Sequence, residues 1–256
     1  MPDAAHDYTP LAGYPSLPTD PVPPELYYAM PVPAAAEGTE IWYSGGDLSP
    51  TALAAAYRQG FFPWEGDPLG WCAPDPRFVI FPDTWHVSRS LRREMRKTDW
   101  MVTVDHAPRS VVQACMSISR PGQPGSWLTP AMVEAYSAFA DHGYMHSAEV
   151  WEGQELVGGL YGVLIGSIFV GDSMFSRRSG ASRVGFATFA EYLWRAGVRM
   201  IDCQVRTDYL ARFGAVEIPR RRYMQQLRQL RTHPLQLRQC SLLPHLAAAT
   251  LLRRSS

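Results

Sequence analysis

The chain has 256 residues, of which 46% are hydrophobic, and its formal net charge is zero. This composition suffices for a buried core and excludes a disordered or fibrous protein, and the lack of any apolar run of roughly 18 residues excludes a membrane-spanning helix. The first ten residues lack the basic region and apolar core of a secretory signal, and the four cysteines show no CxxC spacing, so we expect a cytoplasmic protein without disulfides or a zinc site.

The N-terminal region is rich in proline. Residues 1–37 contain nine prolines and little apolar periodicity, which predicts a disordered extension. Residues 38–78 are expected to form a small N-terminal domain. In it, Ser49 as N-cap and Pro50 at the first helical position predict a helix that ends at Gly60.

Two aromatic stretches follow this helix. F-F-P-W (61–64) and W-C-A-P-D-P-R (71–77) are interrupted by prolines, so we expect rigid loops rather than strands. The prolines hold Asp75 and Arg77 in an extended segment, where the two side chains could pair.

Residues 79–235 are expected to form the main domain, and residues 236–256 a C-terminal tail. Helices are predicted after Pro108 and Pro130, and others are expected at 86–97, 184–195 and near 208–232. Strands are expected at 78–81, 100–104 and 199–205, with three consecutive antiparallel strands at 145–151, 155–165 and 167–175. This order of elements predicts an α+β fold with a mostly antiparallel sheet flanked by helices.

The middle one of the three consecutive strands contains Gly158, Gly159 and Gly162. Glycine inside a strand marks a bulge or the close approach of another backbone or a ligand. The third strand ends in the polar residues Asp172, Ser173 and Ser176. These side chains would point toward the backbone or ligand that approaches the neighbouring strand.

Asp202 and Gln204 give the clearest chemical signal. Two residues apart on one predicted strand, they would lie on the same face and would need a partner to offset their desolvation. One interpretation is a structural hydrogen-bonded pair, and the other is a carboxylate that accepts or orients a proton with the amide as its relay. Asp172 could be a second acid in the same cleft. His146 is interpreted as structural because no G-x-S-x-G elbow accompanies it.

Positive charge is concentrated late in the sequence. Residues 206–256 contain ten arginines and two acids, and R-S-L-R-R-E-M-R-K (89–97) is a second basic cluster. Such clusters fit a polyanionic partner, although arginine on solvated helices is the simpler explanation.

Several short motifs occur together and in order: F-F-P-W, W-C-A-P-D-P-R, S-W-L-T, H-S-A-E-V-W, L-V-G-G-L-Y-G, F-V-G-D-S-M-F-S, I-D-C-Q and F-G-A-V-E-I-P-R-R-R-Y. This set closely resembles the bacterial leucyl/phenylalanyl-tRNA–protein transferase family over roughly residues 41–230. The resemblance implies an N-acetyltransferase-like (GNAT) domain behind a small N-terminal domain. It also implies transfer of Leu, Phe or sometimes Met from aminoacyl-tRNA to proteins that begin with Arg or Lys, which feeds the bacterial N-degron pathway without a metal or cofactor.

By the same resemblance, Asp202 would draw the proton from the attacking amine, Gln204 would lie at the carbonyl or in the relay, and Asp172 would hold the acceptor's amino group. Further positions follow from the same motifs. Substrate-binding residues would be Trp64, Trp127, Leu160, Phe169, Phe189 and Ser176. The tRNA would be bound by Arg89, Arg92, Arg93, Arg220, Arg221 and Arg222.

The chain departs from the family pattern at four places. Asp172 stands where a glutamate is usual, and Gly180-Ala181-Ser182-Arg183 replaces the usual N-A-S-K. Thr207 and Tyr209 replace an asparagine and a histidine, so donor or acceptor preference could differ.

Two alternatives remain open at this point. One is an acyl-CoA-dependent N-acetyltransferase, because R-R-S-G-A-S (177–182) loosely matches an R-x-x-G-x-A phosphate loop before a helix. The other is a non-catalytic tRNA-binding module in which Asp202 and Gln204 are only structural.

Overall fold

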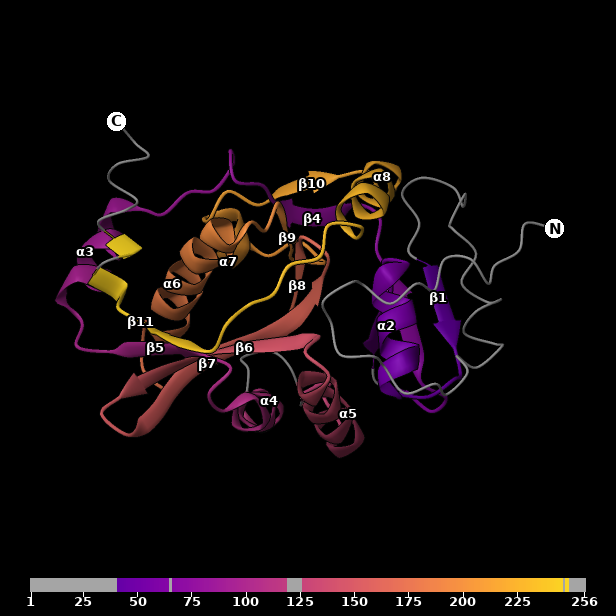
Figure 1. The fold of residues 1–256 in the computed structure, drawn as a ribbon, viewed down its shortest axis with the longest axis horizontal. Coiled ribbons are helices and arrows are strands. Elements are labelled where there is room, and N and C mark those ends of the chain that lie inside the picture. The colour runs from indigo at the N-terminus through magenta and orange to yellow at the C-terminus, as the bar shows by residue number, and fades with distance from the viewer. Residues whose placement is uncertain (1–40, 65, 119–125, 246, 249–256) are drawn as a thin grey trace.

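The computed structural model describes residues 41–64, 66–118, 126–245 and 247–248. Within them the chain forms a three-stranded sheet of order β1-β3-β2 and an eight-stranded sheet of order β10-β4-β9-β8-β7-β6-β5-β11 (Figure 1). The extension expected over residues 1–37 lies outside the described part of the chain.

The first sheet consists of β1 (Ile41–Ser44), β2 (Phe62–Trp64) and β3 (Gly70–Ala73), with α2 (Pro50–Arg58) beside it. Ser49 caps α2 as expected, its hydroxyl accepting from the N–H of Ala52 at 3.2 Å. The prediction of loops is wrong for most of both aromatic stretches, since they form β2 and β3, but it holds for residues 74–76. Pro63 is tolerated because β2 lies at the edge of its sheet, where a missing N–H breaks no central ladder.

The second sheet is antiparallel throughout except between β8 and β9. Its strands are β4 (Arg77–Ile80), β5 (Met101–Val104), β6 (Met145–Glu152), β7 (Glu155–Ile165), β8 (Ile168–Ser176), β9 (Met200–Asp202), β10 (Val216–Ile218) and β11 (Cys240–Leu242). The three consecutive strands β6, β7 and β8 confirm the sequence prediction. β11 comes from the segment expected as a tail, and it covers the edge of β5 that would otherwise be unpaired.

Helices cover both faces of this sheet, as the α+β prediction requires (Figure 1). The helices are α3 (Arg89–Lys97), α4 (Pro108–Ser117), α5 (Pro130–Asp141), α6 (Ala181–Ala196), α7 (Asp208–Ala211) and α8 (Arg220–Leu230). α6 packs on one face, with α3 against it, and α4 and α5 pack on the other. The core on the α4 and α5 side also includes side chains of α2, β2 and β3, so the first sheet shares a core with the second. No helix among the described residues has the length and apolar character needed to cross a membrane.

The glycines of β7 mark close approaches, as predicted. A β-carbon on Gly158 would lie 2.7 Å from that of Ala181, at the start of α6. One on Gly162 would lie 2.1 Å from the carbonyl oxygen of Val170, beside a register shift between β7 and β8. These positions hold α6 and the bulged strand against the sheet.

Candidate active site

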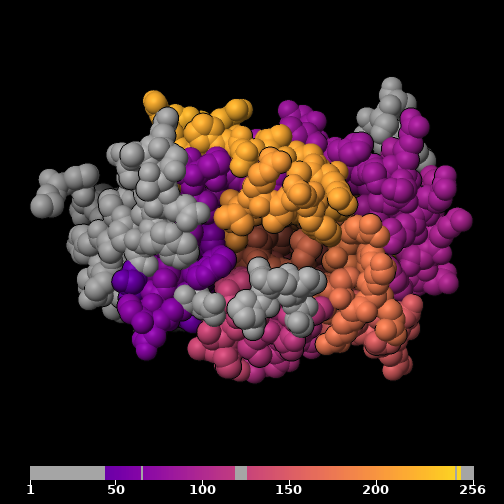
Figure 2. Space-filling model, turned by 180° about the vertical axis from the view of Figure 1, so that it is seen from behind, coloured from indigo at the N-terminus to yellow at the C-terminus, as the bar shows by residue number. Residues whose placement is uncertain are grey.

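A cleft forms where β8 and β9 separate. The two strands pair only between Ile168–Val170 and Met200–Asp202, after which β8 continues to Ser176 paired with β7 on its other side. Residues 171–174 of β8 are partly exposed, whereas residues 168–170 are buried. Figure 2 shows a hollow below α8 whose floor has the orange-brown colour of this part of the sheet.

Asp172 lies on the partly exposed stretch of β8. Tyr57 of α2 donates to Oδ2 at 2.7 Å, and the side-chain amide of Gln204 donates to Oδ1 at 2.7 Å. Behind Tyr57, the hydroxyl of Tyr136 on α5 lies 2.7 Å from that of Tyr57. Burial raises the pKa of Asp172 to about 7, and the hydrogen bonds from Tyr57 and Gln204 oppose that rise.

Asp202 is fully buried and forms an ion pair with Arg77 of β4. Nε of Arg77 lies 2.9 Å from Oδ1, and Nη2 lies 2.7 Å from Oδ2. Tyr223 donates to Oδ2 at 2.8 Å, and the backbone N–H of Gln204 donates to Oδ1 at 2.9 Å. Each carboxylate oxygen therefore accepts at least two hydrogen bonds.

Arg77 is held as firmly as its partner. Its guanidinium carbon lies 5.1 Å from the ring centre of Phe62 and 4.5 Å from that of Tyr223, and Nη1 donates to the carbonyl of Gly60 at 3.1 Å. Burial alone would lower the pKa of Arg77, but Asp202 and then Tyr223 raise it above its ordinary value. The expected pairing of Asp75 with Arg77 is wrong, because Arg77 pairs with Asp202 instead.

Gln204 does not share a strand with Asp202. β9 ends at Asp202, and Gln204 adopts a left-handed backbone with φ of 63°. This corrects the expectation that alternation along a strand would align the two side chains. The turn still brings them together, since the backbone of Gln204 binds Asp202 and its amide binds Asp172. Gln204 therefore links the two carboxylates.

The expected substrate-binding residues fall into two groups. Leu160, Phe169 and Phe189 have exposed fractions of 2%, 0% and 0% and belong to the core under α6. The rings of Phe169 and Phe189 meet edge to face at 5.2 Å. These three side chains are buried in this structure.

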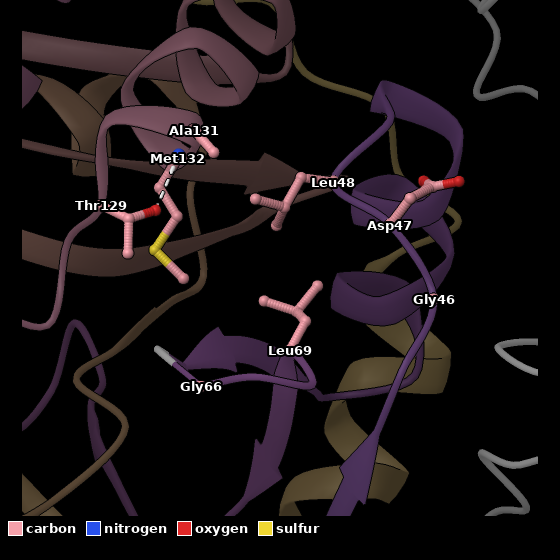
Figure 3. Close-up of a pocket in the computed structure, with 8 residues that line it drawn as sticks. All are labelled: Gly46, Asp47, Leu48, Gly66, Leu69, Thr129, Ala131 and Met132. Carbon is pink, nitrogen blue, oxygen red and sulfur yellow. Dashed lines mark hydrogen bonds between the residues drawn. The ribbon is translucent and has the colours of Figure 1, made fainter.

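The indoles of Trp64 and Trp127 are partly buried and stack on each other at 5.6 Å with an interplanar angle of 12°. Two residues beyond each of them, Gly66 and Thr129 line a cavity of about 360 Å³ between the loops beside the first sheet and the start of α5. Leu48, Leu69 and Met132 point into this cavity, and the carboxylate of Asp47 turns away from it (Figure 3). The lining of the cavity is therefore mostly apolar.

The expected tRNA-binding arginines also differ in exposure. Arg89 and Arg93 of α3 and Arg221 and Arg222 of α8 are exposed, and Arg92 is partly buried. Arg220 has an exposed fraction of only 2%. Its backbone N–H donates to Asp75 at 2.8 Å and its guanidinium donates to the carbonyl of Ala73 at 3.1 Å. Arg220 therefore anchors α8 to the segment before β4, and its expected role as a surface contact for tRNA does not agree with its burial.

The start of α6 contains the R-R-S-G-A-S segment and is already occupied. The carboxylate of Glu94 fills the space that a β-carbon on Gly180 would need, and it pairs with Arg183 at 3.4 Å. The hydroxyl of Ser176 accepts from the N–H of Ser182 at 3.2 Å and donates to the carbonyl of Arg178 at 2.7 Å. Ser176 thus acts as a cap of α6, and a phosphate at this helix start would meet a carboxylate.

Sequence reasoning missed four residues that shape the site: Tyr57, Arg77, Tyr136 and Tyr223. Only Arg77 carried a signal, as a charge fixed between prolines and aromatic residues. His146 is buried and pairs with Asp105 at 2.7 Å, which fits its structural interpretation. Among the described residues, no three His, Cys, Asp or Glu side chains gather closely enough to hold a metal ion.

Comparisons with known proteins agree with the motifs. Residues 79–228 match the family described as leucyl/phenylalanyl-tRNA protein transferase, and residues 46–75 match the N-terminal domain of that family. A curated relative of that name from Myxococcus xanthus is 47% identical over 213 residues, 82% of this chain and 90% of its own. One from Anaeromyxobacter sp. (strain Fw109-5) is 49% identical over 201 residues, 78% of this chain and 86% of its own.

Solved structures give weaker matches. A functionally unknown conserved protein from Staphylococcus epidermidis is 13% identical, with a TM-score of 0.37 over 70% of this chain and 69% of its own. L-PGS from Bacillus licheniformis is 12% identical, with a TM-score of 0.36 over 80% of this chain and 71% of its own. Values this low carry no argument about the fold.

The curated relatives and the cleft together define an aminoacyltransferase. The chain belongs to the leucyl/phenylalanyl-tRNA protein transferase family, which confirms the resemblance seen in the motifs.

Proposed function

We propose that this chain transfers Leu or Phe, and sometimes Met, from aminoacyl-tRNA to the α-amino group of proteins that begin with Arg or Lys. The observation that carries the proposal is the cleft between β8 and β9, where Gln204 links Asp172 to Asp202. An aminoacyl ester is already activated, so its aminolysis requires orientation and proton handling rather than a metal or nucleotide cofactor. The products would enter the bacterial N-degron pathway.

The stacked indoles of Trp64 and Trp127 suit the terminal adenosine of the donor. A base stacking on an aromatic ring contributes about 1–3 kcal/mol, whatever its sequence. The apolar cavity beside the pair leaves room for further contact near the same RNA end.

The side chain of the transferred amino acid would enter between Leu160, Phe169 and Phe189. These side chains are closed over one another in this structure, so donor binding would have to part them. An apolar pocket of this kind distinguishes side chains by only about 1–3 kcal/mol per methylene, which fits acceptance of Leu, Phe and Met together.

The tRNA itself would contact the exposed arginines of two helices. Arg89, Arg92 and Arg93 lie on α3, and Arg221 and Arg222 lie on α8. Phosphate contacts of this type supply affinity without reading sequence. Ser176 supports the cleft indirectly through its cap of α6.

For the fold, we propose an N-acetyltransferase-like domain. Its support is the single parallel pair, β8 and β9, which separates at the site within an otherwise antiparallel sheet. Separating strands leave their polar groups free to meet a ligand, and the polar residues of the site follow that separation.

The two alternatives are less well supported. An acyl-CoA-dependent enzyme would place phosphates at the start of α6, where Glu94 already lies. A non-catalytic tRNA-binding module would have no need for the partly exposed Asp172 held by Tyr57 and Gln204.

The test is incubation of the purified chain with radiolabelled leucyl-tRNA, phenylalanyl-tRNA or acetyl-CoA. Peptides beginning with Arg, Lys, Asp or Glu serve as acceptors. Label from either aminoacyl-tRNA on the Arg and Lys peptides is the expected result. Label from acetyl-CoA, or tRNA binding without transfer, would instead support the respective alternative.

A further inference from the structure

The two carboxylates of the cleft differ in their freedom to accept a proton. Asp202 is fully buried and receives hydrogen bonds from Arg77, Tyr223 and the backbone of Gln204. Protonating it would leave the buried guanidinium of Arg77 without its counter-charge. Asp202 is therefore poorly placed to act as a base.

Asp172 is placed differently. It lies on the partly exposed stretch of β8 and receives hydrogen bonds from Tyr57 and Gln204. The single proton of Tyr57 goes to Asp172, so the oxygen of Tyr57 is left to accept from Tyr136. A carboxylate has about four acceptor positions and these two hydrogen bonds use two of them, so acceptor capacity is left for a substrate proton.

The groups that face Asp172 come from four elements. α2 contributes Tyr57, α5 contributes Tyr136, β4 contributes Arg77 and β9 contributes Asp202. Arg77 and Asp202 neutralise each other, so no net positive charge holds Asp172 ionised. In this setting burial keeps its pKa near 7, in the range suited to a general base at neutral pH.

We propose that Asp172 accepts the proton of the attacking α-ammonium group, and that Asp202 is a positioning residue that holds Gln204 through Arg77 and the turn after β9. This rests on the proposed function. The ammonium gives one proton to Asp172, and the neutral amine then forms the C–N bond while the ester C–O bond breaks. A second amine proton passes to the leaving ribose oxygen, the third stays on the new amide, and Asp172 releases its proton to solvent.

The test compares Asp172→Asn, Asp172→Glu and Asp202→Asn with the unchanged chain in single-turnover transfer from leucyl-tRNA across a range of pH. Two acceptors are used: a peptide beginning with Arg, and an analogue whose hydrazide nucleophile stays neutral across that range. The neutral analogue removes the titration of the acceptor itself. The unchanged chain should then show a rate that rises with pH through about 7.

Asp172→Asn should lower the rate constant by about 10²–10⁴-fold and abolish that rise, with little change in KM. Asp172→Glu should restore part of the rate with a shifted midpoint. Asp202→Asn should lower the melting temperature and keep the rise with pH, with the midpoint moved to lower pH because the charge of Arg77 is no longer offset. If Asp172→Asn keeps the midpoint, or raises only KM, Asp172 holds the acceptor and is not the base. Absence of transfer by the unchanged chain would contradict the proposed function instead.

Discussion

Arg77 and Asp202 form a fully buried ion pair that joins β4 to β9 beneath the cleft, with Nη2 of the arginine 2.7 Å from the carboxylate. The two residues are 125 positions apart in sequence. Each also holds part of the site: Arg77 packs between Phe62 and Tyr223, and Asp202 fixes the turn that carries Gln204. The ion pair therefore fixes the relative positions of β4, β9 and the turn with Gln204 beneath the cleft.

Loss of Arg77 should destabilise the protein strongly. Arg77→Met leaves Asp202 buried and uncompensated, so we expect the free energy of unfolding to fall by about 3–5 kcal/mol in urea titrations. Arg109→Met is the matched control, because its ion pair with Glu134 is exposed and solvent screening leaves it little weight in stability. The double variant Arg77→Met with Asp202→Leu should recover part of the loss. Equal losses for Arg77→Met and the control would show that the buried pair is dispensable.

The pH dependence of the free energy of unfolding should show the raised pKa of Asp172. Its pKa is raised from 3.8 to about 7, so the folded state holds this proton more tightly than the unfolded state. The contribution of Asp172 to the free energy of unfolding is therefore fully present below about pH 4 and is lost as pH rises to about 7. Asp172→Asn cannot ionise. Its free energy of unfolding, relative to that of the unchanged chain, should therefore rise across that pH window by at most about 4 kcal/mol. Urea titrations at several pH values measure the difference. Glu217→Gln, which removes a carboxylate at an exposed site, is the control variant.

The stacked tryptophans should contribute to donor binding. Trp64→Ala or Trp127→Ala should raise KM for leucyl-tRNA roughly five- to 150-fold, the equivalent of 1–3 kcal/mol of stacking. Because the two rings touch, the double variant should lose less than the product of the single losses. Trp100→Phe, whose indole instead bonds Glu152, serves as the control. Unaltered KM in both single variants would place the adenosine elsewhere.

The three consecutive arginines at the start of α8 should have two different functions, tRNA binding and stability. Arg221→Ala with Arg222→Ala should weaken tRNA binding and reduce the slope of log Kd against log salt by about one for each phosphate that is no longer neutralised. Arg220→Ala should instead lower the melting temperature, since Arg220 is buried against Asp75 and Ala73. Filter binding over a salt series measures the first effect and thermal unfolding the second. An unchanged slope in the double variant would show that this surface does not bind tRNA.

Sequence periodicity predicted the regular parts of the fold well. β6, β7 and β8 alternate or run apolar between clear turns, and Ser49-Pro50 and Thr129-Pro130 begin helices by local capping alone. The failures concern interactions that are remote in sequence. β2 and β11 are short strands stabilised by their neighbours, and nothing local separates buried Arg220 from exposed Arg221.

The site was predicted only in part for the same reason. Asp172, Asp202 and Gln204 do come together, but through a left-handed turn rather than through strand alternation. The partners of the carboxylates were out of reach of motif reasoning. Tyr57 is the last buried residue of an alanine-rich helix, and only the packing of α2 on α5 turns it toward Asp172.

The hydrogen bond from Tyr57 crosses from the helix of the first sheet to a strand of the second. The pKa of Asp172 therefore depends on residues that surround both sheets. A fragment beginning at residue 79 would lack both Tyr57, which donates to Asp172, and Arg77, which pairs with Asp202. A shift of the first sheet relative to the second would alter the hydrogen bond from Tyr57, and with it the pKa of Asp172, without any contact to a substrate.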